Sequence, residues 1–230
     1  MDGLRILTIS GWTQPADALL PIVPHADHLD YAGLEGFDAV SVAATSGHYD
    51  VIIGWSLGGV ISRQLLKRGA LSAKVLVLLS SPFRFVVDHR VSEAMPADVF
   101  EQFYANYRDD TQRTVNRFHG LVAKGDRDAR RILDALSHHP LVLQTEHWLP
   151  WMDVLRDYNG FDEDYGLLPP TLIVHGREDA IVPYRQSEFL HQHLPQSEHE
   201  GWEGCGHAPH LHDASRLQAR IQRFVEQVMG

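Results

Sequence analysis

The 230-residue sequence contains a single cysteine, Cys205. One cysteine cannot form an intrachain disulfide or a metal site built from several thiolates. Uninterrupted apolar runs are short, as at 75–79, whereas a helix that crosses a bilayer needs roughly 20 apolar residues. The first residues lack the charged stretch, the long apolar run and the cleavage site of a signal peptide. We therefore expect no membrane-spanning segment and a cytoplasmic protein.

Positive charge is scarce, because 20 lysines and arginines stand against 30 acidic residues, for a net charge of −10. Binding to nucleic-acid phosphates depends on clustered Lys and Arg, so no nucleic-acid partner is expected. The composition is 44% hydrophobic with only 18 glycines and 12 prolines, which excludes collagen-like, coiled-coil and disordered classes. A chain of this length buries one main core, and we expect a monomer.

Several segments have the near-continuous apolar pattern of strands buried on both faces of a parallel sheet. They are 4–9, 49–53, 74–79 and 171–174. Weaker patterns favour a short helix at 16–23, strands at 28–31 and 197–202, and a final helix at 214–228. The predicted fold class is α/β, with a mostly parallel sheet flanked by helices.

Residues 83–160 differ from the segments on either side, because they contain no strong strand pattern. Apolar residues recur there at helical spacing in three runs, 97–107, 111–122 and 129–136. We interpret 83–160 as a helical cap, inserted into a core made of 1–82 and 161–230.

The pentapeptide Gly54-Trp55-Ser56-Leu57-Gly58 has the form G-x-S-x-G. It lies between a predicted strand and a segment of helical spacing, which is the context in which this motif carries a nucleophilic serine. The turn is so tight that side chains at the glycine positions would collide with neighbouring backbone. The alternative is a glycine-rich turn whose serine takes no part in a reaction, but the context favours Ser56 as a nucleophile.

A serine nucleophile needs a histidine base, and that histidine needs a carboxylate to hold its tautomer. His207 lies in the loop sequence Gly-Cys-Gly-His-Ala-Pro before the last predicted helix, and Asp179 follows the strand 171–174. Parallel sheets place functional groups at the carboxyl ends of their strands. The chain order Ser56, Asp179, His207 is that of α/β-hydrolases, so these three residues are the predicted catalytic triad.

The other histidines do not suggest a metal site. Some of the 15 lie close together in sequence, such as His191 with His193 and His210 with His212, but no H-E-x-x-H pattern or carboxylate cluster accompanies them. We expect neither a metal nor a cofactor. Cys205 stands between two glycines, which favours packing over a nucleophilic role.

Two backbone N–H groups are needed to hold the oxyanion of a tetrahedral intermediate. One usually comes from the residue after the nucleophile and the other from the loop after an early strand. Leu57 and Trp12 occupy these positions. Trp12 can also be an ordinary buried aromatic residue, and both roles are compatible because only its backbone N–H is used.

These motifs resemble the α/β-hydrolase superfamily and, within it, the family of pimeloyl-[acyl-carrier protein] methyl ester esterases of biotin synthesis. The resemblance rests on Gly-Trp-Ser-Leu-Gly-Gly at 54–59, Gly-Arg-Glu-Asp at 176–179 followed by Val-Pro, Gly-His-Ala-Pro at 206–209, and Ser-Ser-Pro at 80–82. It extends into the cap through Phe103, Arg113, Arg117, Phe118 and their neighbours. The family usually has His-Gly where this chain has Ser10-Gly11.

The resemblance implies a fold whose cap follows the sixth strand, with the first strands of the fold absent here. It also implies hydrolysis of the methyl ester at the far end of a pimeloyl chain carried on acyl-carrier protein, with Phe103 and Phe118 lining an acyl tunnel. A carboxylesterase or thioesterase acting on small or medium-chain acyl esters is the alternative enzyme. An inactive hydrolase-like binding protein is the alternative of another class.

Residues 108–131 are basic within this acidic chain. They carry seven cations against four acids, a net charge of +3, whereas the rest of the chain carries −13. A basic cap would steer an acidic carrier protein toward the site, and we expect Arg113, Arg117 and Arg130 to contact the substrate complex. The alternative is a solvated helix face stabilised by ion pairs within the helix.

Overall fold

The computed structural model describes residues 3–44, 47–137 and 145–230. Its centre is a sheet of six parallel strands in the order β2-β1-β3-β4-β5-β6. The strand bounds are Ile6–Ile9 (β1), Asp27–His28 (β2), Gly47–Trp55 (β3), Leu71–Leu79 (β4), Thr171–Gly176 (β5) and Ser197–Trp202 (β6). The predicted parallel sheet and all four strongly patterned strands are therefore present.

The two central strands, β3 and β4, have different environments along their lengths. In each strand the first residue is buried and the next three are partly or fully exposed, but 51–55 and 75–79 are buried without interruption. The register pairs Val51 with Val75 and Trp55 with Leu79. Helices cover both faces of the sheet around these residues, so side chains on either face pack against protein. This burial explains the continuous apolar pattern.

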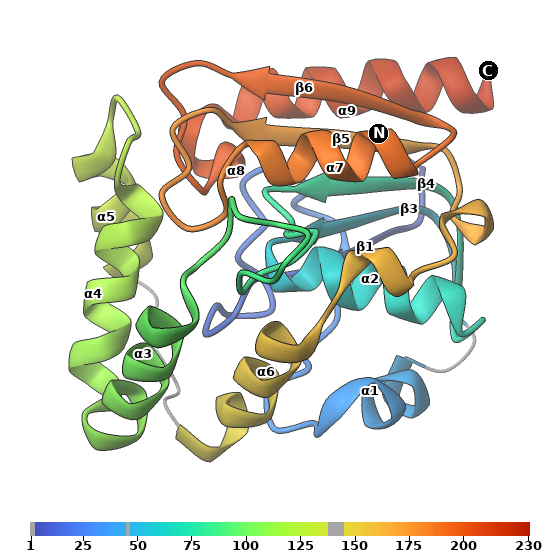
Figure 1. Ribbon diagram of the computed structural model, residues 1–230. Coiled ribbons are helices and arrows are strands. Elements are labelled where there is room, and N and C mark those ends of the chain that lie inside the picture. Colours follow the sequence, from blue (N-terminus) through green and yellow to red (C-terminus); the bar gives the residue numbers. More distant parts are fainter. Residues whose placement is uncertain (1–2, 45–46, 138–144) are drawn as a thin grey trace.

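Helices surround the sheet on both faces (Figure 1). The connections β3-α2-β4 and β5-α7-β6 both lead to the next strand in the same direction along the sheet. Because such connections are right-handed, α2 (Leu57–Lys67) and α7 (Arg185–His193) lie on the same face of the sheet. The last helix, α9 (Ala214–Met229), contacts β4, and its Gln218 donates a hydrogen bond to the carbonyl oxygen of Ile22. Two further helices are α1 (Gly36–Ala44) and the short α8 (Pro209–His212).

The segment between β4 and β5 forms the predicted helical cap. It contains α3 (Ala97–Asp109), α4 (Thr111–Ala123), α5 (Ala129–Ser137) and α6 (Thr145–Asp157), and α4 contacts both α3 and α5. The cap helices α3, α4 and α5 stand beyond the carboxyl ends of the strands (Figure 1). The strand before the cap, β4, is the fourth among the described residues, and it takes the place of the sixth strand of the fold.

Both ends of this insertion meet at Arg63 of α2, whose side chain is completely buried. Its Nη2 donates hydrogen bonds to the carbonyl oxygen of Pro82, 2.9 Å away, and to the hydroxyl oxygen of Tyr158, 2.8 Å away. Its Nε lies 3.4 Å from a carboxylate oxygen of Glu163. A buried guanidinium needs such partners to offset its desolvation, so Arg63 joins the outgoing and returning chains to the core.

Two of the weaker predictions differ from the structure. Residues 16–22 form successive turns instead of a helix, because Pro21 lacks an N–H group and disfavours the helical conformation of the residue before it. The strand expected at 28–31 is shorter and lies at Asp27–His28. None of the described helices is long and apolar enough to span a membrane.

Candidate active site

Ser56 stands at the junction between β3 and α2, where the chain turns sharply. Its backbone has φ 54° and ψ −120°, a strained conformation for a residue with a side chain. Its N–H donates to the carbonyl oxygen of Leu79 at 2.8 Å, which holds the turn against the neighbouring strand. A Cβ at Gly58 would come within 2.0 Å of the carbonyl oxygen of Ile9, so only glycine fits there. The turn presents the Ser56 hydroxyl at the carboxyl edge of the sheet.

The three residues predicted as a triad lie in hydrogen-bond contact. His207 Nε2 is 2.9 Å from Ser56 Oγ, and His207 Nδ1 is 2.7 Å from Asp179 Oδ2. All three residues are buried. With the hydrogen on Nδ1, the imidazole donates to Asp179 and accepts the hydroxyl proton of Ser56 at Nε2. This arrangement can remove the proton of Ser56 as its oxygen attacks a carbonyl carbon.

Asp179 is held and kept ionised by its surroundings. Its Oδ1 accepts hydrogen bonds from the N–H groups of Ile181 and Val182, each at 2.9 Å. Burial alone would raise the pKa of its carboxyl, but the charges and hydrogen bonds of His207 and His175 outweigh burial, so that pKa falls well below its usual range. An ionised Asp179 can orient the His207 ring and stabilise its protonated form.

A second imidazole at Asp179 was not predicted from the sequence. His175 Nε2 lies 2.8 Å from the carbonyl oxygen of Val182 and 3.2 Å from Asp179 Oδ2. A carbonyl oxygen can only accept, so this nitrogen carries the hydrogen. His175 is completely buried at the end of β5. The only sequence signal for it was a histidine that directly follows a buried strand and stands four residues before the acid.

The two residues predicted for the oxyanion hole both lie close to Ser56. Leu57 is the first residue of α2, where backbone N–H groups have no acceptor within the helix. Trp12 lines the same cavity as Ser56, and a Cβ built on the adjacent Gly11 would be 3.4 Å from Ser56 Cβ. The Trp12 side chain is also part of the core, as the alternative interpretation held, because it is only 3% exposed.

Ser56 opens into a small apolar cavity beneath the cap. The cavity is lined by Trp12, Ser56, Phe85, Phe100, Phe103, Phe118, Met152, Leu155 and Ile181. It has a volume of about 10 Å³, which is room for about one water molecule. Phe103 and Phe118 pack on Trp12, with ring centroids 5.5 and 5.2 Å apart. Both predicted aromatic residues therefore lie beside the serine.

The predicted basic residues lie elsewhere. Arg113, Arg117 and Arg130 are exposed on the cap helices α4 and α5, and none lines the cavity at Ser56. The neighbouring Arg131 Nε lies 2.7 Å from Oδ2 of Asp128, which directly precedes α5.

One group of side chains offers donor atoms of the kind that bind a metal. Asp126, Cys205 and His212 are buried, and each contributes an atom within 4.8 Å of the others. Burial, together with the negative charge of Asp126 nearby, raises the pKa of the Cys205 thiol far above its usual value. Two of the three donor atoms are already in contact with each other, because Asp126 Oδ2 lies 2.8 Å from His212 Nδ1.

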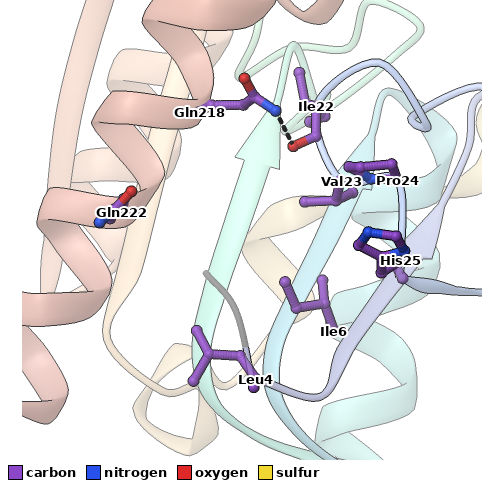
Figure 2. A pocket seen from close by; sticks show the side chains of 10 residues that line it. Leu4, Ile6, Ile22, Val23, Pro24, His25, Gln218 and Gln222 are labelled. Carbon is purple, nitrogen blue, oxygen red and sulfur yellow. Dashed lines mark hydrogen bonds between the residues drawn. The ribbon is translucent and has the colours of Figure 1, made fainter.

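A larger hollow lies away from Ser56, between the start of the chain and α9. It has a volume of about 690 Å³ and is lined mainly by residues around Ile6, Ile22 and Gln218. Figure 2 shows Gln218 reaching from α9 to the carbonyl group of Ile22, with Leu4 and Ile6 below. No residue of the predicted triad lines this hollow.

The sequence matches a known family over most of its length. Residues 38–214 match the family described as alpha/beta hydrolase fold. The pimeloyl-[acyl-carrier protein] methyl ester esterase of Nitrosomonas europaea is 31% identical over 174 residues, which cover 72% of this chain and 66% of that protein. A protein of the same name from Neisseria meningitidis serogroup C is 28% identical over 256 residues. This match covers 97% of this chain and 94% of that protein.

Similarity also extends to longer proteins. The biotin biosynthesis bifunctional protein BioHC of Teredinibacter turnerae is 27% identical over 187 residues. This match covers 76% of the chain but only 33% of that relative, and a second bifunctional relative is covered to 35%. The chain thus spans about a third of the length of these bifunctional relatives.

Solved structures share the architecture at low identity. An esterase from Exiguobacterium antarcticum has a TM-score of 0.79 at 17% identity. A bromoperoxidase from Bacillus anthracis has a TM-score of 0.76 at 18% identity. Each match covers 96% of this chain and 92% of the other. Proteins with such different names share the fold, so the fold alone does not define a reaction. The family match, the sheet and the strand-turn-helix at Ser56 together show that the chain belongs to the α/β-hydrolase fold family, in which it resembles the pimeloyl-[acyl-carrier protein] methyl ester esterases.

Proposed function

We propose that this protein is a serine esterase with Ser56, His207 and Asp179 as its catalytic triad. His207 Nε2 takes the proton of Ser56 as Oγ attacks the ester carbonyl carbon, and the N–H groups of Leu57 and Trp12 hold the resulting oxyanion. The C–O bond then breaks, and the leaving alkoxide takes the proton from His207. Water attacks the acyl-serine next, its proton passes to His207 and then to Ser56, and the carboxylate product leaves.

One observation carries this proposal. An unbroken chain of hydrogen bonds, 2.7 and 2.9 Å long, runs from Asp179 through His207 to a serine in a strained backbone conformation. A buried serine with no chemical role would not need this geometry. The side chains around Ser56 are apolar, so the group that it attacks is expected to carry an apolar chain, and these side chains must move apart to admit it because the cavity has room for about one water molecule.

We further propose that the substrate is a pimeloyl methyl ester on acyl-carrier protein, which is cleaved to pimeloyl-[acyl-carrier protein] and methanol. The names of the curated relatives support this substrate. In this proposal, Phe103 and Phe118 contact the acyl chain inside the cap, residues 83–160. Arg113, Arg117 and Arg130 attract the acidic carrier from the cap surface. The reaction uses no metal or cofactor.

The test compares two substrates on the same preparation. Methyl pimeloyl-[acyl-carrier protein] is expected to give a higher kcat/KM than short p-nitrophenyl esters. The reverse order would assign a carboxylesterase or thioesterase of small acyl esters. A fluorophosphonate probe, which labels activated serines, is expected to label the wild type but not Ser56→Ala. A wild type that neither turns over esters nor takes the label would be a binding protein of hydrolase fold.

A further inference from the structure

The loop that carries His207 is held by the cap as well as by the core. At the turn between α4 and α5, the carbonyl oxygen of Val122 accepts a hydrogen bond from the N–H of His207 at 3.3 Å. The N–H of Arg127 donates to the carbonyl oxygen of Gly204 at 2.9 Å. A Cβ at Gly206 would come within 2.9 Å of the carbonyl oxygen of Lys124. The backbones of the two segments are therefore in direct contact.

The carboxylate of Asp126 lies at the centre of this contact, and its side chain is completely buried. Its Oδ2 accepts a hydrogen bond from the N–H of Gly206 at 3.2 Å, and it also lies 2.8 Å from His212 Nδ1. Gly206 immediately precedes His207, and His212 follows it in α8. One carboxylate thus contacts the chain on both sides of the proposed base.

We propose that Asp126 is a positioning residue for His207, acting through Gly206 and His212. The inference rests on the proposed catalytic role of His207. Asp126 does not touch Ser56 or the cavity beside it. Its effect is geometric: it fixes the backbone of the loop so that the imidazole lies between Asp179 and Ser56.

Small displacements matter for such a base. A misplacement of about 1 Å can cost about a hundredfold in rate. Asp179 can orient the His207 ring through Nδ1, but it does not fix the backbone from which the ring projects. Glu178 holds the same loop from the core side, where its Oε2 accepts a hydrogen bond from the N–H of Cys205 at 3.2 Å. Without Asp126, the N–H of Gly206 would lose its buried acceptor on the cap side, and the loop would keep only the 3.3 Å bond from the N–H of His207 to Val122 among these two contacts.

The experiment measures kcat and KM for a short p-nitrophenyl ester, which does not depend on carrier docking. Asp126→Ala is expected to lower kcat about 10- to 100-fold with KM changed less than about twofold, because the loop moves but the cavity does not. Asp126→Asn retains a side-chain oxygen for the N–H of Gly206 and is expected to recover most of kcat. The matched control is Asp128→Asn, whose side chain is half exposed and pairs with Arg131, and it should keep the wild-type kcat.

A second readout distinguishes positioning from stability alone. The far-downfield proton resonance of the bond between His207 Nδ1 and Asp179 is expected to weaken or shift in Asp126→Ala and to remain in Asp128→Asn. If Asp126→Ala does not fold, His212→Gln replaces it in both measurements, with a severalfold fall in kcat expected. Wild-type kcat in the folded Asp126→Ala variant, or an equal loss in Asp128→Asn, would overturn the inference. A wild type that fails to label with fluorophosphonate would instead refute the proposed function.

Discussion

The indole N–H of Trp55 donates a hydrogen bond to the backbone carbonyl oxygen of His207, and the two atoms are 2.8 Å apart. Trp55 is the last residue of β3 and directly precedes Ser56. Its ring is buried and lies against the ring of His210, with centroids 4.3 Å apart. The residue next to the serine thereby holds the loop that carries the histidine.

The first prediction concerns this bond. Trp55→Phe keeps an aromatic ring but removes the donor, and the free energy of unfolding should fall by about 1 kcal/mol or more, through the lost hydrogen bond and the smaller ring. Because the His207 loop loosens, kcat for a short ester should fall as well. Trp151→Phe is the matched control, since its buried indole donates to the backbone carbonyl oxygen of Tyr31 and packs on Tyr31 and Phe37, not on the His207 loop. It should lose stability but keep its kcat, as urea denaturation and steady-state kinetics would establish.

The second prediction concerns the proposed triad. Ser56→Ala and His207→Ala should each lower kcat about 10⁴-fold or more, and Asp179→Asn about 10⁴-fold, by analogy with other serine hydrolases. Circular dichroism should report a folded protein in each case. Ser62→Ala is the control, because this buried hydroxyl donates to the carbonyl oxygen of Gly58 and has no contact with His207. Near-normal turnover by Asp179→Asn would move the acid role to another residue, with Glu178 the first to test.

The third prediction concerns the pH dependence of stability. Burial, together with the smaller effect of the neighbouring His207, lowers the pKa of His210 to about 3. Below pH 6.5 the unfolded chain therefore binds a proton that the folded protein does not. Stability should fall with decreasing pH between about 6.5 and 3, by up to about 1.4 kcal/mol per pH unit.

The variant His210→Phe isolates this effect, because phenylalanine retains a ring against Trp55 but cannot be protonated. Urea denaturation at pH 7 and pH 5 should show a smaller loss of stability in the variant than in the wild type. His199, whose pKa burial lowers to about 4, titrates in both proteins and cancels in the comparison. Parallel pH curves for the two proteins would contradict the prediction.

The fourth prediction concerns the exposed cap arginines. Replacing Arg113 and Arg117 with Ala should lower kcat/KM for the carrier-bound methyl ester by up to about fivefold per residue, and should weaken its salt dependence. Hydrolysis of a short p-nitrophenyl ester should change little, because neither side chain lines the cavity. Arg223→Ala on α9 is the control for an exposed charge outside the cap. Equal losses on both substrates would indicate that the arginines support the cap instead of the carrier.

Local sequence patterns predicted the parts of the fold and site that depend on local physics. The continuous apolar runs of β3 and β4 follow from their burial on both faces, and the turn at Ser56 follows from the space that its glycines leave free. Asp179 and His207 could be located because each follows a strand in a loop of limited length. The spacing of apolar residues likewise located α3, α4 and α5 within a residue or two of their ends.

Contacts between distant segments could not be predicted in this way. Asp126 meets Gly206 across 80 positions and His212 across 86, and nothing around Asp126 distinguishes it from an exposed turn residue. His175 contacts the proposed acid only because the loop after β5 folds back on the strand. The apolar residues of 16–23 likewise predict a helix, but the segment 16–22 forms turns because Pro21 lacks an N–H group for helical hydrogen bonding.

The sheet ends on one side in β2, which consists of Asp27 and His28 only. A long, exposed edge strand presents a row of free backbone groups to which another chain can add a strand, and this is a common start of aggregation. The edge at β2 offers two residues, both with polar side chains, and the Nδ1 of His28 lies 2.6 Å from the hydroxyl oxygen of Thr8 in the adjacent strand. An edge this short is a poor template for a growing sheet, so this side of the described sheet is protected against chain-to-chain pairing.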